Sequence, residues 1–202
     1  MAWAFPMSPH PFDSAPHPAF LPPIRRLLVF CGSRTGHDPR HAAQARALGA
    51  LLARRGVTLV YGGGALGLMG ELARAAMAGG GRVEGVIPRF LMDLEVAQPG
   101  LAELVIVESL HLRKAEMFAR ADAVLALPGG VGTLDELVEL LSWRNLRLHD
   151  RPLLMMGAGG FWDPLVALLA HIEAEGFTGP GLDRTLVSLD GPEALEALLG
   201  AA

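Results

Sequence analysis

A glycine-rich turn followed by two acids is the segment of this sequence best suited to chemistry. Residues 128–136 read Pro-Gly-Gly-Val-Gly-Thr-Leu-Asp-Glu and follow an apolar run at 123–127. The pattern predicts a buried strand, a tight turn and a helix with acids in its first turn. Glycines let a ligand approach the backbone closely, and a helix start presents unpaired N–H groups at the positive end of its dipole. We therefore expect an anion-binding loop, with Glu136 within reach of the bound molecule.

A purely structural role for the same residues is equally compatible with the local sequence. Thr133 and Glu136 have the spacing of a capping box, in which a hydroxyl and a carboxylate satisfy the first N–H groups of their own helix. Thr133 can serve both roles. For Glu136 the two roles compete, because a carboxylate turned back toward the cap is less available to a ligand.

Two further features could take part in ligand binding. The loop at 62–70, Gly-Gly-Gly-Ala-Leu-Gly-Leu-Met-Gly, is rich in glycine, but its spacing differs from the usual dinucleotide fingerprint. Its glycines could equally serve to pack a helix against a sheet. Arg113 and Lys114 open a predicted helix, where cations oppose the dipole. An anionic ligand would compensate for this, although an ordinary solvated charge pair with Glu116 or neighbouring acids is slightly favoured.

Few other residues are candidates for catalysis or metal binding. Cys31 is the only cysteine, which excludes an intramolecular disulfide, fits a reducing, cytoplasmic setting and is typical of a small buried thiol. No group of Cys, His, Asp and Glu has metal-ligand spacing. Lys114 is the only lysine, so any Schiff-base chemistry would have to use it. We expect neither a metal nor a cofactor.

The composition indicates one globular domain that lacks a general affinity for nucleic acid or membranes. The chain has 202 residues, of which 51% are hydrophobic, and its net charge is −4. No apolar run reaches the roughly 18 residues that a membrane helix needs. Seven prolines fall within residues 1–23, where no secretory signal pattern occurs. We predict a proline-rich disordered tail over residues 1–24 and a single domain over residues 25–202.

Apolar segments alternate with amphipathic segments from residue 27 onward. The predicted strands are 27–31, 57–61, 83–87, 104–107, 123–127, 153–156 and 186–189, and the predicted helices are 39–55, 67–78, 112–120, 133–146, 163–175 and 192–199. This alternation predicts an α/β fold, a Rossmann-like doubly wound parallel sheet with helices on both faces. Ligands bind such sheets beyond the carboxyl ends of the strands, at a switch in strand order. Both glycine loops lie at strand ends, so they would form one site if their strands are neighbours.

Taken together, these stretches resemble the Lonely Guy (LOG) family, long labelled lysine decarboxylase-like. The resemblance runs from about residue 25 to the end. It includes Phe-Cys-Gly-Ser at 30–33, Leu-Val-Tyr-Gly-Gly-Gly at 59–64 with Gly-Leu-Met-Gly at 67–70, Gly-Val-Ile-Pro-Arg-Phe-Leu at 85–91, Glu-Val at 95–96, His111 with Arg-Lys at 113–114, the loop at 128–136, Trp143 and His-Asp at 149–150.

The resemblance implies hydrolysis of the N-glycosidic bond of adenine-type nucleoside 5′-monophosphates, which releases a free base, a cytokinin in some members, and ribose 5-phosphate. It implies a homodimer, and it implies that Arg113 and Glu136 are the catalytic pair. The substrate contacts that it implies are Glu95, Lys114, Gly130, Val131, Gly132, Thr133, Leu134, Asp135 and Ser142.

Other activities also have to be considered. A lysine decarboxylase would need pyridoxal phosphate on Lys114, and a non-catalytic carrier, like the related molybdenum cofactor carriers, would need the anion-binding loop alone. Within the hydrolase class, the sequence does not choose between AMP, the substrate of an AMP nucleosidase, and N6-prenylated AMP. Departures from the family pattern at Arg34, Gln98, Leu110, Ser142, Asn145 and Arg147 leave the catalytic pair in place.

Overall fold

The computed structural model describes residues 23–92, 94–182 and 185–200. The tail predicted for residues 1–24 therefore lies almost entirely outside the described residues. The strands are β1 (Arg26–Phe30), β2 (Thr58–Tyr61), β3 (Val83–Pro88), β4 (Glu103–Val107), β5 (Ala123–Ala126), β6 (Leu153–Met156) and β7 (Leu186–Leu189). The helices are α1 (Pro39–Arg54), α2 (Gly67–Ala78), α3 (Leu110–Ala119), α4 (Val131–Asn145), α5 (Asp163–Ala174) and α6 (Pro192–Gly200), with a short 3₁₀ helix, η2, at Arg89–Leu91.

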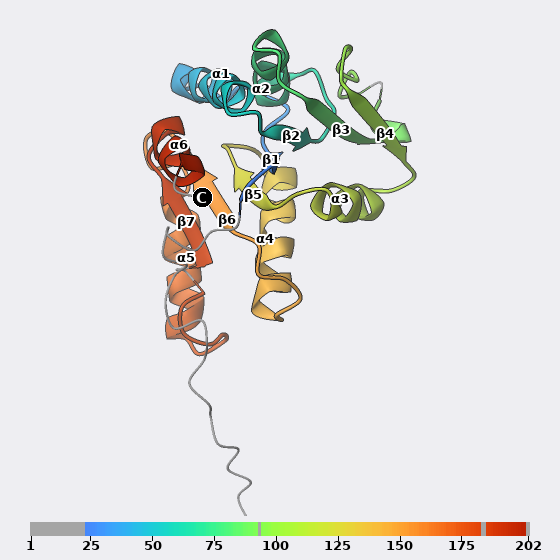
Figure 1. The fold of residues 1–202 in the computed structure, drawn as a ribbon. Coiled ribbons are helices and arrows are strands. Elements are labelled where there is room, and N and C mark those ends of the chain that lie inside the picture. Colours follow the sequence, from blue (N-terminus) through green and yellow to red (C-terminus); the bar gives the residue numbers. More distant parts are fainter. Residues whose placement is uncertain (1–22, 93, 183–184, 201–202) are drawn as a thin grey trace, which may run out of the picture.

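The seven strands form one parallel sheet in the order β4-β3-β2-β1-β5-β6-β7. Side chains from α1, α2 and α6 pack on one face of the sheet, and side chains from α3, α4 and α5 pack on the other. Figure 1 shows α1 and α2 together on one side of the strands and α3 and α4 on the other. The predicted doubly wound α/β fold is confirmed.

Strands that are buried on both faces explain the continuous apolar runs in the sequence. In β1, Leu27 and Val29 belong to the core under α1 and α2, whereas Leu28 and Phe30 belong to the core under α3 and α4. All four side chains are at most 3% exposed. Each such side chain contributes about 1.5–3 kcal/mol when it is buried fully. The cores on both faces therefore hold β1 in the middle of the sheet.

The strand order does not meet the condition stated for the two glycine loops, that their strands be neighbours. The loop at 62–64 follows β2 and the loop at 128–130 follows β5, but these strands are not neighbours because β1 lies between them. The order of the strands reverses at β1 and β5, since β2 to β4 extend the sheet in one direction and β6 and β7 in the other. The two loops consequently flank the carboxyl end of β1 at the topological switch point.

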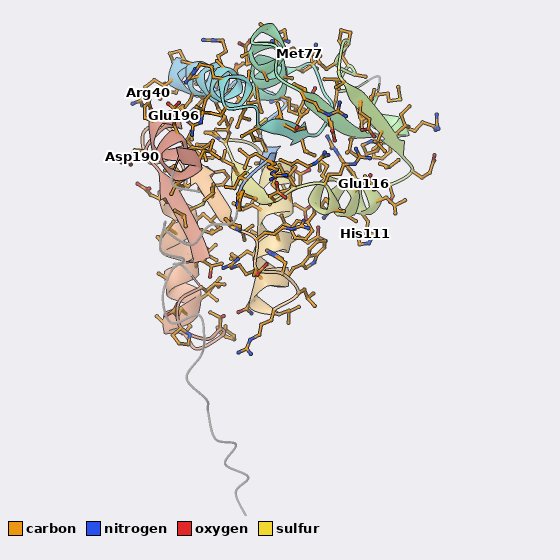
Figure 2. All side chains as sticks on the ribbon, in the orientation of Figure 1. Arg40, Met77, His111, Glu116, Asp190 and Glu196 are labelled. Atoms are coloured by element: carbon orange, nitrogen blue, oxygen red, sulfur yellow. The ribbon has the colours of Figure 1, made fainter. Side chains whose placement is uncertain are left out.

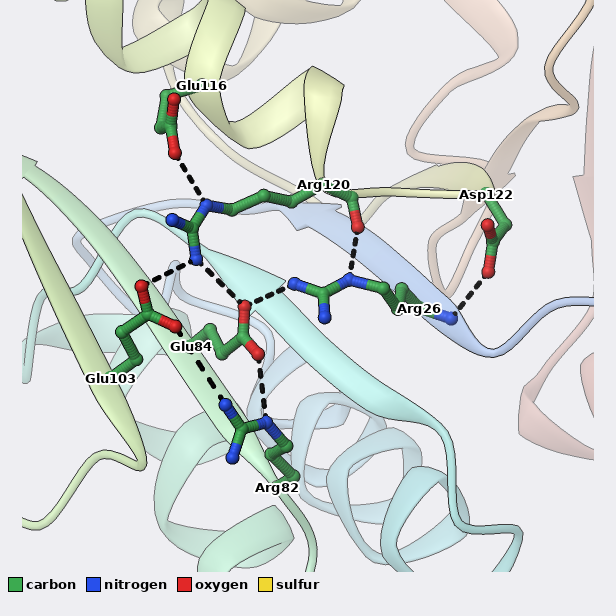
Figure 3. Close-up of polar contacts among 7 residues, drawn as sticks. All are labelled: Arg26, Arg82, Glu84, Glu103, Glu116, Arg120 and Asp122. Carbon is green, nitrogen blue, oxygen red and sulfur yellow. Dashed lines mark hydrogen bonds and ion pairs between the residues drawn. The ribbon is translucent and has the colours of Figure 1, made fainter.

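A charge network ties together the opposite, amino-terminal edge of the sheet (Figure 3). Glu84 in β3 is 1% exposed and contacts Arg26, Arg82 and Arg120, with an Oε1–Nε distance to Arg82 of 2.9 Å. Arg120 also bonds Glu116 at 2.7 Å. Burial alone raises the pKa of the Glu84 carboxyl, but the hydrogen bonds from Arg82 and Arg26 hold it below its usual value. This network links β1, β3 and α3.

Among the residues that the structure describes, no helix combines the length and the hydrophobicity that a membrane span requires.

Candidate active site

A cavity of about 740 Å³ opens at the carboxyl edge of the sheet, where the strand order reverses. Its wall is built from the end of β1 and the turn after it (29–38), the starts of α2 and α4, and single residues from distant segments. These include Gly62, Glu95, Arg113 and Phe161. The volume lies within the range of about 300–1,000 Å³ that is usual for small-molecule sites. The cavity is therefore the candidate active site.

Helix α4 begins without a side-chain cap, which bears on the capping box predicted for its first residues. Its N-cap is Gly130, which has no side chain to bond the first N–H groups. Thr133 and Glu136 lie three and six residues beyond this cap, so the predicted capping box is wrong. The N–H groups of the first turn have no acceptor within the helix. They are thus available to an anion in the cavity, which Gly130–Thr133 line.

The glycine before the cap is required by close packing. A Cβ atom on Gly129 would lie 2.1 Å from the Thr133 Oγ1 atom, a distance that no side chain could tolerate. Thr133 itself is 4% exposed and lines the cavity. The turn therefore brings the backbone at 129–130 against the first turn of α4.

Helix α1 starts at the same cavity but is already capped by an acid. The Asp38 carboxylate accepts a hydrogen bond from the Arg40 N–H at 2.9 Å and pairs with the Arg40 guanidinium at 2.6 Å. The hydrogen bonds from Arg40 lower the pKa of Asp38 to about 2, so this carboxylate stays charged. The sequence prediction of an Asp-Pro helix start is confirmed, since Pro39 is the first residue of α1. The start of α1 therefore offers no site for a second anion.

Glu136 lines the cavity one turn further along α4 and is partly buried. Burial raises the pKa of Glu136 to about 7; the Arg113 guanidinium acts in the opposite direction, and the Glu95 carboxylate raises it further. Near neutral pH this carboxyl group is consequently present in both its charged and its neutral form. Such a pKa suits a group that exchanges a proton or stabilises a developing positive charge.

Arg113 faces the same cavity, and its guanidinium donates hydrogen bonds to three groups. It is 6% exposed, and its Nε donates to the Val86 carbonyl oxygen at 3.1 Å. Its Nη2 donates to the Gly62 carbonyl oxygen at 2.8 Å and to Glu95 Oε2 at 3.0 Å. Arg113 does not form the expected solvated pair with Glu116, which bonds Arg120 instead. These bonds fix the guanidinium in one orientation.

The segment that supplies Glu95 is tied to the first glycine loop. The Ala65 N–H donates to the Val96 carbonyl oxygen at 2.8 Å, and Gly64 and Ala97 form an isolated bridge. Val96 has a φ of 51°, a left-handed conformation that a β-branched residue adopts only under strain. This backbone geometry brings Glu95 to Arg113.

The structure brings only part of the predicted residue set together. Arg113, Glu136, Glu95 and residues 130–133 line the cavity. The other predicted substrate-binding residues, Lys114, Leu134, Asp135 and Ser142, are not among the lining residues, and the last three are exposed.

Lys114 is engaged by two acids of α4. Its Nζ lies 3.0 Å from Asp135 Oδ2 and 2.8 Å from Glu139 Oε2. Burial alone lowers the pKa of Lys114, but the bonds to Glu139 and Asp135 raise it above its usual value. A Schiff base needs a neutral amine in the substrate cavity. The only lysine of the chain therefore does not fit a pyridoxal phosphate site.

Several lining residues were missed by sequence reasoning, including Arg34, His37, His41 and Phe161. They follow the carboxyl ends of β1 and β6, and that position could have identified them once the strand order was known. The thiol of Cys31 also lines the cavity; burial raises its pKa far above the usual value and keeps it neutral. His111 lies exposed on α3, outside the lining (Figure 2).

No group of three or more potential metal ligands is present in the residues that the structure describes.

The fold and the site define the class of protein: a doubly wound α/β protein whose cavity at the switch point contains an uncapped helix start and a buried charge cluster. The family model described as "Possible lysine decarboxylase" matches residues 69–199. The cytokinin riboside 5′-monophosphate phosphoribohydrolase LOG of Oryza sativa subsp. japonica is 42% identical over 176 residues, which cover 87% of this chain and 72% of the rice protein. The Arabidopsis thaliana protein LOG7, which bears the same enzyme name, is 42% identical over 165 residues, covering 82% and 76%.

The chain therefore belongs to the Lonely Guy (LOG) family. Among solved structures, the molybdenum cofactor binding protein of Rippkaea orientalis superposes with a TM-score of 0.66 and covers 88% of this chain and 96% of its own. The sequence identity is 18%, so this likeness establishes the shared fold alone.

Proposed function

We propose that this protein hydrolyses the N-glycosidic bond of adenine-type nucleoside 5′-monophosphates and releases the free base and ribose 5-phosphate. The family relatives bear the name of this reaction with cytokinin nucleotides. The observation that carries the proposal is the presence in one cavity of the uncapped start of α4 and of Glu136 beside the Arg113–Glu95 pair. The uncapped helix start suits the phosphate of the substrate, and Glu136 with its charged neighbours suits the sugar.

The substrate's phosphate is assigned to the N–H groups that begin α4. The start of α1 is occupied by its own Asp38, and the Leu68 and Met69 N–H groups of α2 donate to the Gly32 carbonyl oxygen. The start of α4 is therefore the helix end at this cavity that can take an anion. From there the ribose extends toward Glu136, which lies about one helical turn away along the same helix. The phosphate is remote from the reacting bond and acts by orienting the sugar, an effect that can supply as much as about 7–11 kcal/mol.

In the reaction, the bond between C1′ and the base nitrogen breaks, and both bonding electrons leave with the base. Positive charge develops on the sugar, as in other glycoside cleavages. The ionised Glu136 carboxylate stabilises this charge and accepts a proton from the attacking water, whose oxygen bonds to C1′. The departing base takes up a proton from solvent, and Glu136 then releases the proton of the attacking water to solvent, so that it returns to its ionised form. Arg113 favours the ionised form of Glu136, which is the form that the reaction uses.

The two candidate substrates are AMP and N6-prenylated AMP, which differ in their base. The cavity volume of about 740 Å³ is compatible with both nucleotides.

We also infer a homodimer, because apolar side chains of α3 and α4 are exposed beside the site. Leu110 and Leu112 are 50% and 49% exposed, and Leu134 and Val138 are 40% and 41% exposed.

A product assay tests the proposal. AMP, N6-isopentenyl-AMP and adenosine are incubated with the protein, and free base and ribose 5-phosphate are measured by chromatography. We expect equal amounts of base and sugar phosphate from at least one nucleotide, and far slower release from adenosine, which lacks the phosphate. Equal rates with AMP and adenosine would contradict the role of the phosphate. Binding of nucleotide without any base release would favour a carrier.

A further inference from the structure

Two arginines line the cavity, and their surroundings differ. Arg113 is buried and its charge is balanced by Glu95 at 3.0 Å. Arg34 is exposed, and among the described residues its side chain has no hydrogen bond or ion pair. Lys114 and Arg40 are each paired with carboxylates. Of the two arginines that line the cavity, Arg34 is thus the one whose guanidinium has no partner among the described residues.

The backbone that carries Arg34 is held between two helix starts. The Gly32 N–H donates to the Pro128 carbonyl oxygen at 3.0 Å, and the Gly32 carbonyl oxygen accepts the Leu68 N–H at 3.0 Å. A Cβ atom on Gly67 would lie 2.3 Å from the Arg34 nitrogen, so the turn packs directly on the start of α2. The main chain of Arg34 is therefore fixed beside the loop that leads into α4, while its side chain is exposed.

The position of this turn relative to α4 sets what Arg34 can reach. A Cβ atom on Gly32 would lie 3.2 Å from the Cα atom of Gly129, one residue before the α4 N-cap. Arg34 follows Gly32 by two residues and lines the same cavity as Gly130–Thr133, so its long side chain can approach the N–H groups at the start of α4. A phosphate bound there carries up to two negative charges, and the helix start supplies only partial positive charge.

On the basis of the function proposed above, we propose that Arg34 is the cation that recognises the 5′-phosphate of the substrate. Its guanidinium closes over the phosphate from the side opposite α4 and forms charge-assisted, bidentate hydrogen bonds with two phosphate oxygens. The Arg113 guanidinium, which already donates to Glu95 and to two carbonyl oxygens, is left to act on the sugar side of the cavity.

Binding of the sugar phosphate tests this assignment without relying on turnover. Ribose 5-phosphate is titrated by calorimetry into the wild-type protein, Arg34→Ala, Arg34→Lys and the control Arg25→Ala. Arg25 is also exposed, and it precedes β1 at the opposite edge of the sheet, so its replacement removes the same charge far from the cavity. Hydrogen bonds to charged groups predict a loss of affinity of about 10- to 150-fold for Arg34→Ala. We expect an intermediate loss for Arg34→Lys and no change for Arg25→Ala.

Kinetics distinguish phosphate recognition from a structural role. Arg34→Ala should raise KM for AMP at least about 10-fold and leave the slow turnover of adenosine unchanged. Equal affinity of wild type and Arg34→Ala for ribose 5-phosphate would overturn the assignment, as would a wild type that does not bind this compound. If binding depends on Arg34 but no nucleotide is cleaved, the assignment stands and the hydrolase proposal fails.

Discussion

Replacing Glu136 by Gln should abolish most of the activity and, above pH 7, make the fold more stable. The substitution preserves shape and removes the charge. In the folded protein burial raises the pKa of Glu136 to about 7, whereas the ordinary value is 4.5. The folded state therefore holds this proton more tightly than the unfolded state. The protonated Glu136 therefore stabilises the folded state fully below pH 4.5. This stabilisation is lost as the pH rises through 7, because the buried group must then ionise.

The magnitude follows from the two pKa values. Ionising the buried carboxyl group at pH 8 costs up to about 3 kcal/mol, at about 1.4 kcal/mol per tenfold change in proton affinity. Solvent screens the exposed part of the side chain, so we expect Glu136→Gln to gain about 1–2 kcal/mol at pH 8. For a chain of this size the gain corresponds to a rise in Tm of about 2–8 °C. At pH 5 the difference should be small.

The assay is urea denaturation of wild type and Glu136→Gln at pH 5 and pH 8, with base release from AMP measured in parallel. Glu108→Gln is the control, because the Glu108 side chain is 73% exposed. Turnover should fall at least about 100-fold, as for the loss of a transition-state electrostatic contact. A variant less stable than wild type at pH 8, or one stabilised equally at both pH values, would refute the reasoning.

Three further predictions test other parts of the account. The kcat/KM for AMP should rise about tenfold per pH unit below pH 7 and level off above it, because the ionised Glu136 is the active form; a flat profile between pH 5 and 8 would contradict this. Glu84→Ala should lose about 1.5–3 kcal/mol of stability in urea unfolding, since it removes the buried acceptor of charged hydrogen bonds from Arg26, Arg82 and Arg120; an unchanged midpoint would show that the network is dispensable. Val96→Gly should raise stability by about 1 kcal/mol in the same assay, because glycine adopts the positive φ without strain; a lower midpoint would argue against strain.

The regular elements could be predicted closely because local patterns determine them. The bounds predicted for α2 and β6 match the structure, and the Asp38-Pro39 helix start was recognised from its cap. The predicted start of α4 was two residues late. Thr133 resembles an N-cap residue in sequence, but the helix begins at Val131, where Gly130 and the packing of Gly129 against Thr133 decide the geometry.

The charge cluster of the site depends on tertiary structure and was only partly predictable. Glu95 and Arg113 are 18 residues apart and meet because Val96 takes a left-handed conformation and residues 64–65 bind the segment that carries Glu95. No local spacing encodes such a contact. The resemblance to the family singled out both residues, while their mutual pairing and the carbonyl oxygens that hold Arg113 emerge only from the folded chain.

A crystal structure of Glu136→Gln with bound AMP tests the central claim most directly. We expect the phosphate on the N–H groups of residues 131–133. We also expect the amide that replaces the carboxylate at position 136 to lie within about 3–4 Å of C1′, the separation of a near-attack arrangement. A phosphate bound away from the start of α4, or a ribose ring placed out of reach of position 136, would contradict the account.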